Sequence, residues 1–246
     1  MVGGGGPAAV ITVLVEPGTL AAGREVRLVE TEAHHLRVRR VRDGARVRLM
    51  DGEGRVAQGL VIGNPEDGRL VVEACEVRVP PAVLLLAVGS GDRERFGWLV
   101  EKAAELGVTD IIPLETERTA GVATKVRDEH LAKLQRRARE AIKQSGAPWA
   151  PRVHTVHTIG ALVERPGGGT RWLADADGGT PSLADPASAL QVVVGPEGGL
   201  SGGERATLLG AGFSPIRLGP HVLRFETAAM AAAVIGGSLR REPVDA

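Results

Sequence analysis

The chain has 246 residues, of which 43% are hydrophobic, so it can form one large domain or two modest ones with a sizeable core. No apolar run approaches the ~20 residues of a membrane-spanning helix, and the N-terminus lacks the basic flank and apolar stretch of a signal peptide. Cys75 is the single cysteine, which excludes an internal disulfide and a cysteine-based zinc site. We therefore expect a cytoplasmic protein with no membrane segment and no metal.

The net charge is zero, with 30 basic and 30 acidic side chains, but the basic residues are concentrated in two segments. Residues 37–48 hold six arginines against Asp43 alone, and residues 118–152 hold nine lysines and arginines against three acidic residues. Such patches suit contacts to the phosphates of a nucleic acid, although solvated strand and helix faces would give the same pattern. With three tryptophans, three phenylalanines and no tyrosine, the chain has few aromatic platforms for stacking bases.

Residues 10–79 are β-rich. Their short runs of branched residues alternate with turns that contain glycine, a spacing that predicts a small barrel. The expected strands are residues 10–15, 25–29, 46–50 and 70–74. His34 and His35 would face opposite sides of a strand and could not share a metal there, so we expect them at the start of a helix instead. Pro80 and Pro81 then mark a boundary, since neither can donate to a β-ladder.

After this boundary, strands and helices alternate, which predicts an α/β domain with a parallel sheet. Asp92 is the expected cap of a helix that Gly107 ends, and Ser201 with Glu204 forms a capping box that opens a later helix. A basic helix with an apolar stripe ends at Gly146. The expected strands are residues 83–88, 108–114 (broken by Pro113), 172–174, 190–194 and 215–218, and an alanine-rich helix spans residues 226–239.

Two glycine-rich loops are the strongest functional signal. Gly-Pro-Glu-Gly-Gly at residues 195–199 directly follows the apolar run 190–194, and Leu-Gly-Pro-His-Val-Leu-Arg-Phe-Glu-Thr-Ala-Ala occupies residues 218–229. Each is typical of a buried strand that ends in a loop and opens a helix, and open α/β sheets bind ligands at this edge. Neither loop has the spacing of a dinucleotide fingerprint or a P-loop. Because glycines let the backbone approach a ligand, we expect one pocket lined by main chain.

The two loop sequences resemble those of the SPOUT-class, trefoil-knotted methyltransferases and, within them, the RsmE-type 16S ribosomal RNA uridine-N3 methyltransferases. Three further stretches agree and occur in the family's order: His-His-Leu-Arg-Val at residues 34–38, Lys-Ala-Ala-Glu-Leu-Gly-Val at 102–108 and Glu-Ala-Ile-Lys-Gln-Ser-Gly at 140–146. The resemblance covers most of the chain. It implies a PUA-like RNA-binding β-barrel domain over residues 1–79, then a parallel-sheet SPOUT methyltransferase domain with a trefoil knot over residues 80–246.

The resemblance also implies an enzyme that uses S-adenosylmethionine to methylate uridine N3 in the 16S ribosomal RNA of the small ribosomal subunit. It implies a homodimer with the cofactor site near the interface, and the small residues from Ala228 to Gly237 fit either such an interface or close packing on the sheet. Glu197 either contacts the cofactor or caps a helix. The expected cofactor-binding residues are Gly195, Pro196, Glu197, Gly198, Gly199, Leu218, Gly219, Leu223, Arg224, Glu226, Thr227 and Ala228.

Uridine N3 must lose a proton before it accepts a methyl group, and a guanidinium near the base would stabilise the resulting anion. Arg224, beside the second loop, is the first candidate for this catalytic role, and Arg118 is the second. The alternatives are a clamp on the loop for Arg224 and a solvated surface charge for Arg118. Glu226 could serve as a base, but a carboxylate at a helix start is more often a cap.

The expected RNA-binding residues are His35, Arg37, Arg39, Arg40, Arg136, Lys143 and Gln144. The chain departs from the family at three positions: residues 11–13 lack an arginine, and Ala147 and Phe225 stand in place of an arginine and a threonine. The first two changes remove expected RNA contacts. Two alternatives stay open: methylation of another base or of a ribose 2′-hydroxyl in ribosomal or transfer RNA, and a non-catalytic RNA-binding assembly factor.

Overall fold

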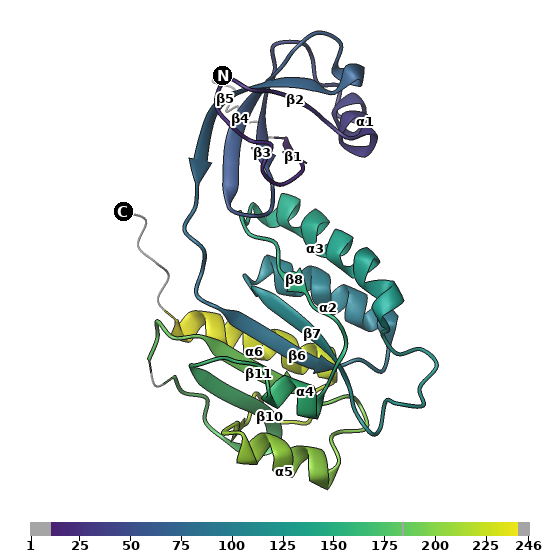
Figure 1. Ribbon diagram of the computed structural model, residues 1–246, viewed down its shortest axis with the longest axis vertical. Helices are drawn as coiled ribbons and strands as arrows, with labels where there is room; N and C mark the ends of the chain where they lie inside the picture. The colour runs from purple at the N-terminus through teal and green to yellow at the C-terminus, as the bar shows by residue number, and fades with distance from the viewer. Residues whose placement is uncertain (1–10, 184, 241–246) are drawn as a thin grey trace, which may run out of the picture. The chain divides into compact units, whose positions relative to one another are not determined.

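The computed structural model describes residues 11–183 and 185–240, and it divides into two compact units. Of these described residues, the first unit holds those up to Pro80 together with Ile142–Trp149, and the second holds Pro81–Ala141 and those from Ala150 onward. Figure 1 shows the elements in chain order from purple to yellow. Each unit buries its own hydrophobic core.

The first unit is built on a five-stranded sheet with the order β1-β3-β4-β5-β2. Neighbouring strands pair antiparallel, except that β1 runs parallel to β3. Alternate residues such as Val47 and Leu49 face inward and form the core. The strands are β1 Thr12–Leu14, β2 Glu25–Arg27, β3 Arg46–Met50, β4 Arg55–Val61 and β5 Arg69–Val77. The β-rich architecture expected of the N-terminal part is thus confirmed.

Two elements of the first unit differ from the expected pattern. Strand β4 was not predicted, because Gly59 interrupts its run of apolar residues. The glycine leaves room for the neighbouring strand: a Cβ at this position would lie 2.7 Å from Cδ1 of Leu49 on the paired strand β3. Helix α1, Glu30–Val38, contains His34 and His35 in its second half rather than at its start. Its buried face carries Ala33 and Leu36, which join the core of the unit.

The second unit contains a seven-stranded sheet in which all pairs among the described strands are parallel. The order is β12-β10-β11-β6-β7-β8, with β9 also beside β7. The strands are β6 Leu84–Gly89, β7 Asp110–Glu115, β8 Arg152–Val153, β9 His157–Thr158, β10 Thr170–Gly179, β11 Leu190–Val194 and β12 Ser214–Ile216. The helices are α2 Arg93–Glu105, α3 Leu131–Ser145, α4 Ile159–Val163, α5 Gly202–Gly210 and α6 Phe225–Leu239.

Helices cover both faces of this sheet. Leu84 and Leu86 of β6 belong to the core under α2, α3 and α6, and Leu85 belongs to the core under α4 and α5 (Figure 1). The strand is buried on both faces, as its continuous apolar sequence predicts. The expected α/β class with a parallel sheet is confirmed. Across the described ranges, no helix has the length and apolar character needed to cross a membrane.

Local signals in the sequence set where several of these elements begin. The Asp92 side chain accepts hydrogen bonds from two amides in the first turn of α2, at 2.9 and 3.1 Å. Ser201 and Glu204 form the expected capping box of α5. Pro113 does not break β7, contrary to expectation. It lies between the residues that pair with β8 and those that pair with β9, so its missing N–H interrupts neither ladder.

Candidate functional site

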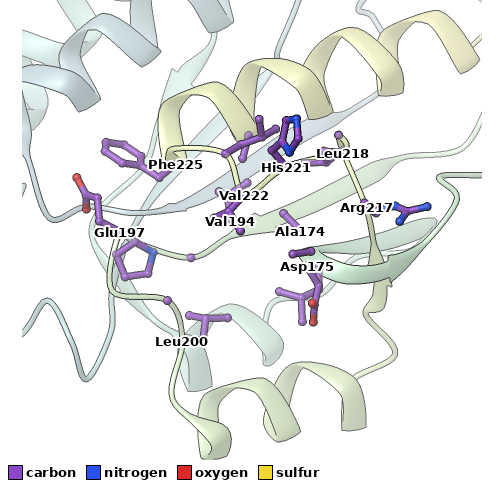
Figure 2. Close-up of a pocket in the computed structure, with 18 of the residues that line it drawn as sticks. Ala174, Asp175, Val194, Glu197, Leu200, Arg217, Leu218, His221, Val222 and Phe225 are labelled. Atoms are coloured by element: carbon purple, nitrogen blue, oxygen red, sulfur yellow. The ribbon is translucent and has the colours of Figure 1, made fainter.

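A cavity of about 380 Å³ opens at the carboxyl end of β11, beside the middle of β10. The loop after β11, the segment after β12 and the start of α6 complete its walls (Figure 2). Small and apolar residues form most of the lining: Leu173, Ala174, Ala176, Val194, Gly195, Pro196, Gly199, Leu200, Leu218, Gly219, Val222, Leu223, Phe225 and Ala228. The charged and polar lining residues are Asp175, Glu197, Arg205, Arg217 and His221. The two glycine-rich loops therefore wall one cavity.

The first loop, residues 195–199, is packed tightly against its surroundings. A Cβ at Gly89, the last residue of β6, would lie 2.3 Å from the backbone nitrogen of Pro196, so only glycine admits the loop at this place. Gly199 adopts φ +74° and donates from its amide to the Pro196 carbonyl at 2.8 Å. These contacts fix a tight turn in the cavity wall.

The second loop, residues 218–223, presents unpaired main chain. Within the part of the chain that the structure describes, its amides and carbonyls make no backbone–backbone hydrogen bond, whereas the flanking Arg217 amide bonds to Gly179 at 2.8 Å. A Cβ at Gly219 would lie 3.6 Å from the Leu223 side chain, an ordinary contact. Main-chain groups that lack partners beside a cavity are suited to hold the polar edges of a ligand.

Asp175 and Arg205 add an ion pair to the cavity wall. The Arg205 guanidinium donates to Oδ2 of Asp175 from Nε at 3.0 Å and Nη2 at 2.9 Å. The amide of Asp177 donates to Oδ1 at 3.0 Å, and this bond together with Arg205 lowers the pKa of Asp175. Neither residue was predicted from the sequence. The signal for Asp175 was its place just after the short apolar run of β10, toward the ligand-binding edge of the sheet.

The two arginines expected to be catalytic lie in different environments. Arg118 donates from Nη1 to the carbonyl of Gly198 and so braces the first loop. Arg224 is the N-cap residue of α6, and its side chain is exposed. Its neighbours Leu223 and Phe225 line the cavity, but Arg224 does not. Among the described residues, the Arg224 guanidinium has no hydrogen bond or ion pair within the chain.

Arg95, on α2, is a third residue that was not predicted from the sequence. Its Nη1 lies 3.7 Å from Oε1 of Glu197 in the first loop and 4.0 Å from Oε1 of Glu226 at the start of α6. The other carboxylate oxygen of Glu226, Oε2, is buried without a hydrogen-bond partner among the described residues. Arg95 thus links the first loop to the helix that follows the second. Its contacts span more than a hundred positions, so no local pattern marks it.

The expected cofactor-binding residues divide into two groups. Those that line the cavity are Gly195, Pro196, Glu197, Gly199, Leu218, Gly219, Leu223 and Ala228. Those that lie outside its lining are Gly198, Arg224, Glu226 and Thr227. Figure 2 places Glu197 at one end of the cavity and Arg217 at the other. The described chain holds no group of three or more His, Cys, Asp or Glu side chains placed to bind a metal ion.

The expected RNA-binding residues also differ in their exposure and in their contacts with other side chains. Arg39, Arg40, Arg136 and Gln144 are exposed. The Arg37 guanidinium contacts Nδ1 of His34, and His35 is half-buried. The Lys143 ammonium donates to the buried carboxylate of Glu32 at 2.7 Å, so this lysine is engaged inside the first unit.

Comparison with known proteins places the chain among RNA-modifying enzymes. Residues 79–235 match a family model described as an RNA methyltransferase domain, and residues 30–73 match one described as an RNA methyltransferase PUA domain. Ribosomal RNA small subunit methyltransferase E of Mycobacterium bovis is 32% identical over 215 residues, which cover 81% of this chain and 80% of the relative. The protein of the same name from Synechocystis is 31% identical over 217 residues, 82% of this chain and 69% of the relative.

Solved structures agree with this placement. Ribosomal RNA small subunit methyltransferase E from Neisseria gonorrhoeae, bound to S-adenosyl methionine, superposes with a TM-score of 0.82 at 26% identity and covers 94% of this chain and 98% of that chain. A predicted RNA methyltransferase from Thermotoga maritima gives a TM-score of 0.68 at 29% identity, with coverage of 92% and 97%.

Proposed function

The chain belongs to the ribosomal RNA small subunit methyltransferase E family, and from that premise we propose that it transfers a methyl group from S-adenosylmethionine to N3 of a uridine in 16S ribosomal RNA. The observation that carries the proposal is the cavity of about 380 Å³ between the two glycine-rich loops. The loops supply the walls that a main-chain-lined cofactor site requires, and they occupy the ligand-binding edge of the sheet.

The lining fits S-adenosylmethionine. Its apolar walls suit an adenine ring, and the unpaired main chain of residues 218–223 supplies donors and acceptors for a nucleoside. Residues 195–199 with Leu218, Gly219 and Leu223 would hold the adenosine part, and the family resemblance adds Glu226, Thr227 and Ala228 beside it. The bound cofactor supplies an electrophilic methyl group on a positively charged sulfur.

The protein's own contribution to the chemistry is to stabilise a deprotonated uracil. Arg224 is the first candidate for this role. Its exposed guanidinium has no partner among the described residues, and the residue directly follows the second loop. Arg118 is the second candidate, but its bond to the Gly198 carbonyl favours a role in positioning the first loop. A guanidinium beside the base would lower the pKa of N3–H and stabilise the anion.

RNA binding is proposed for the 1–79 PUA-like domain and for the basic helix α3 of the 80–246 methyltransferase domain. The exposed arginines Arg39, Arg40 and Arg136 support this, since each is available for a phosphate. The proposed partner is the small ribosomal subunit, and the proposed location is accordingly the cytoplasm.

A homodimer is also proposed, but its interface is not the row of small residues on α6. Ala229, Ala232 and Ala233 are buried in the core of their own unit, so the small-residue face of α6 packs on the sheet. Trp98 on α2 is 45% exposed and Val234 on α6 is 53% exposed, and these apolar side chains would meet a second copy of the chain. Sedimentation of wild type should give about twice the chain mass, and Val234→Glu should shift the protein toward monomer.

The deciding experiment combines a binding and a product measurement. Isothermal titration with S-adenosylmethionine tests the cavity, and small subunits that lack the modification serve as the methyl acceptor. Mass spectrometry of the digested RNA should find 3-methyluridine. A ribose-methylated or other base product would change the target, and absent cofactor binding would favour the non-catalytic RNA-binding factor.

A further inference from the structure

A second pocket, of about 60 Å³, lies between α2 and α3 and shares no residue with the main cavity. Three of its lining residues, Arg93, Lys133 and Arg137, carry a positive charge, and His130 adds an imidazole. The lining is Arg93, Glu94, Gly97, His130, Lys133, Leu134 and Arg137. All of these belong to the second unit. Its small volume suits a single anionic group rather than a nucleoside.

Gly97 shapes this pocket. It is buried inside α2, where glycine is less favourable than alanine by roughly 1 kcal/mol. A Cβ at this position would lie 2.2 Å from Nη1 and 3.1 Å from Cζ of Arg137. The Arg137 guanidinium therefore occupies the space above the missing side chain, and the unfavourable helix residue has a structural reason: it lets the guanidinium lie against α2.

Positive charge in the pocket is only weakly compensated. Arg137 Nη2 lies 3.9 Å from Oε2 of Glu94, whose side chain is 70% exposed. An exposed ion pair of this length holds its partners loosely. His130 accepts a hydrogen bond at Nδ1 from the Arg127 amide at 3.0 Å, and its Nε2 lies 3.6 Å from Oε1 of Glu129. For Lys133 the described residues contain no ion pair, so the pocket has cationic donors available to a ligand.

We infer that this pocket binds one backbone phosphate of the substrate RNA, an inference that rests on the proposed function. A guanidinium offers two parallel donors to a phosphate, and Lys133 adds a point charge beside it. The exposed Arg136 lies on the same helix and extends the basic surface beyond the pocket. The chain carries no net charge, so this concentration of cations is local rather than a general excess.

The test compares variants that differ in how they change the pocket. Gly97→Ala keeps every charge but displaces the Arg137 guanidinium, and Arg137→Gln removes the charge itself. Arg165→Gln is the matched control, since it removes one half-buried charge of the same unit, outside the basic segment 118–152 and outside the pocket lining. Affinity for a 16S ribosomal RNA fragment is measured over a range of salt, and thermal unfolding of each variant checks the fold.

Arg137→Gln should weaken RNA binding by about tenfold, as for a lost charged hydrogen bond, and lower the salt slope by roughly one unit. Gly97→Ala should weaken binding comparably with no loss of thermal stability, while Arg165→Gln stays near wild type. Wild-type affinity in both pocket variants would overturn the inference and leave the proposed function standing. If the two pocket variants lose binding of inorganic phosphate but keep wild-type RNA affinity, the pocket binds a free anion, and the inference is also overturned. Absent methylation by wild type would instead contradict the proposed function, and the RNA affinities would still decide the pocket.

Discussion

The two loops that wall the cavity are held in different ways. Residues 195–199 are fixed by the packing of Pro196 on Gly89, by an internal turn and by the bond from Arg118 to the Gly198 carbonyl. Residues 218–223 make no backbone–backbone hydrogen bond within the described chain, and Val222 in this loop is 87% exposed. Contacts within the chain therefore fix the first loop, whereas the main-chain groups of the second loop remain available to a ligand.

This difference indicates a division of labour. A wall that the protein already holds needs nothing from a ligand, whereas main-chain groups without partners gain hydrogen bonds when a ligand binds. We therefore expect the cofactor to complete the hydrogen bonds of the second loop. Residues that hold the first loop should affect cofactor affinity, and residues that follow the second should affect turnover.

The largest expected effect is on turnover, at Arg224. Arg224→Lys keeps the charge but loses the planar fork of the guanidinium. If this residue stabilises the uracil anion, turnover falls by about 100-fold, as for the loss of one electrostatic donor, while cofactor affinity stays near wild type. Single-turnover methylation and isothermal titration measure the two quantities. A parallel fall in both would make Arg224 a clamp on the loop instead.

The next effect is on cofactor affinity, at Arg118. Arg118→Ala removes the donor to the Gly198 carbonyl and releases the first loop. The affinity for S-adenosylmethionine should fall by about tenfold, the size of a lost hydrogen bond from a charged donor. Turnover at saturating cofactor should change much less. If turnover falls and affinity does not, Arg118 rather than Arg224 serves the chemistry, and the division of labour between the loops is reversed.

A matched pair of glycine variants tests the packing directly. Gly89→Ala would place a Cβ 2.3 Å from the backbone nitrogen of Pro196, so the first loop must shift, and we expect destabilisation by about 1–3 kcal/mol. Gly219→Ala in the second loop meets Leu223 at 3.6 Å and should leave the unfolding temperature unchanged. Equal unfolding temperatures for both variants would show that the first loop is as adaptable as the second.

The sequence predicted the elements that local chemistry determines. The Asp92 cap, the Ser201 capping box and the strand–loop–helix character of residues 195–199 all follow from residues close together in the chain. Packing across the sheet determined the rest. Gly59 interrupts the apolar pattern of β4, and the reason for this glycine is the Leu49 side chain of the neighbouring strand. Arg95 contacts Glu197 and Glu226, which lie far away in sequence. The trefoil knot that the family resemblance implies would likewise have no local signature, since threading leaves hydrophobic periodicity unchanged.

The smallest expected effect concerns the ion pair between Asp175 and Arg205, which ties β10 to the helix after the first loop. The Asp177 amide and Arg205 lower the pKa of Asp175 in the folded protein, whereas the pKa of an aspartate in an unfolded chain is about 3.9. The carboxylate therefore stabilises the fold above about pH 4, and this contribution is lost as the pH falls through the lowered pKa. Asp175→Asn should lower the unfolding temperature slightly at pH 7, with Asp177→Asn as a control whose backbone donor is kept. The difference from wild type should shrink as the pH falls through the lowered pKa, and a difference of the same size at pH 7 and in acid would mean that the side chain acts through its shape rather than its charge.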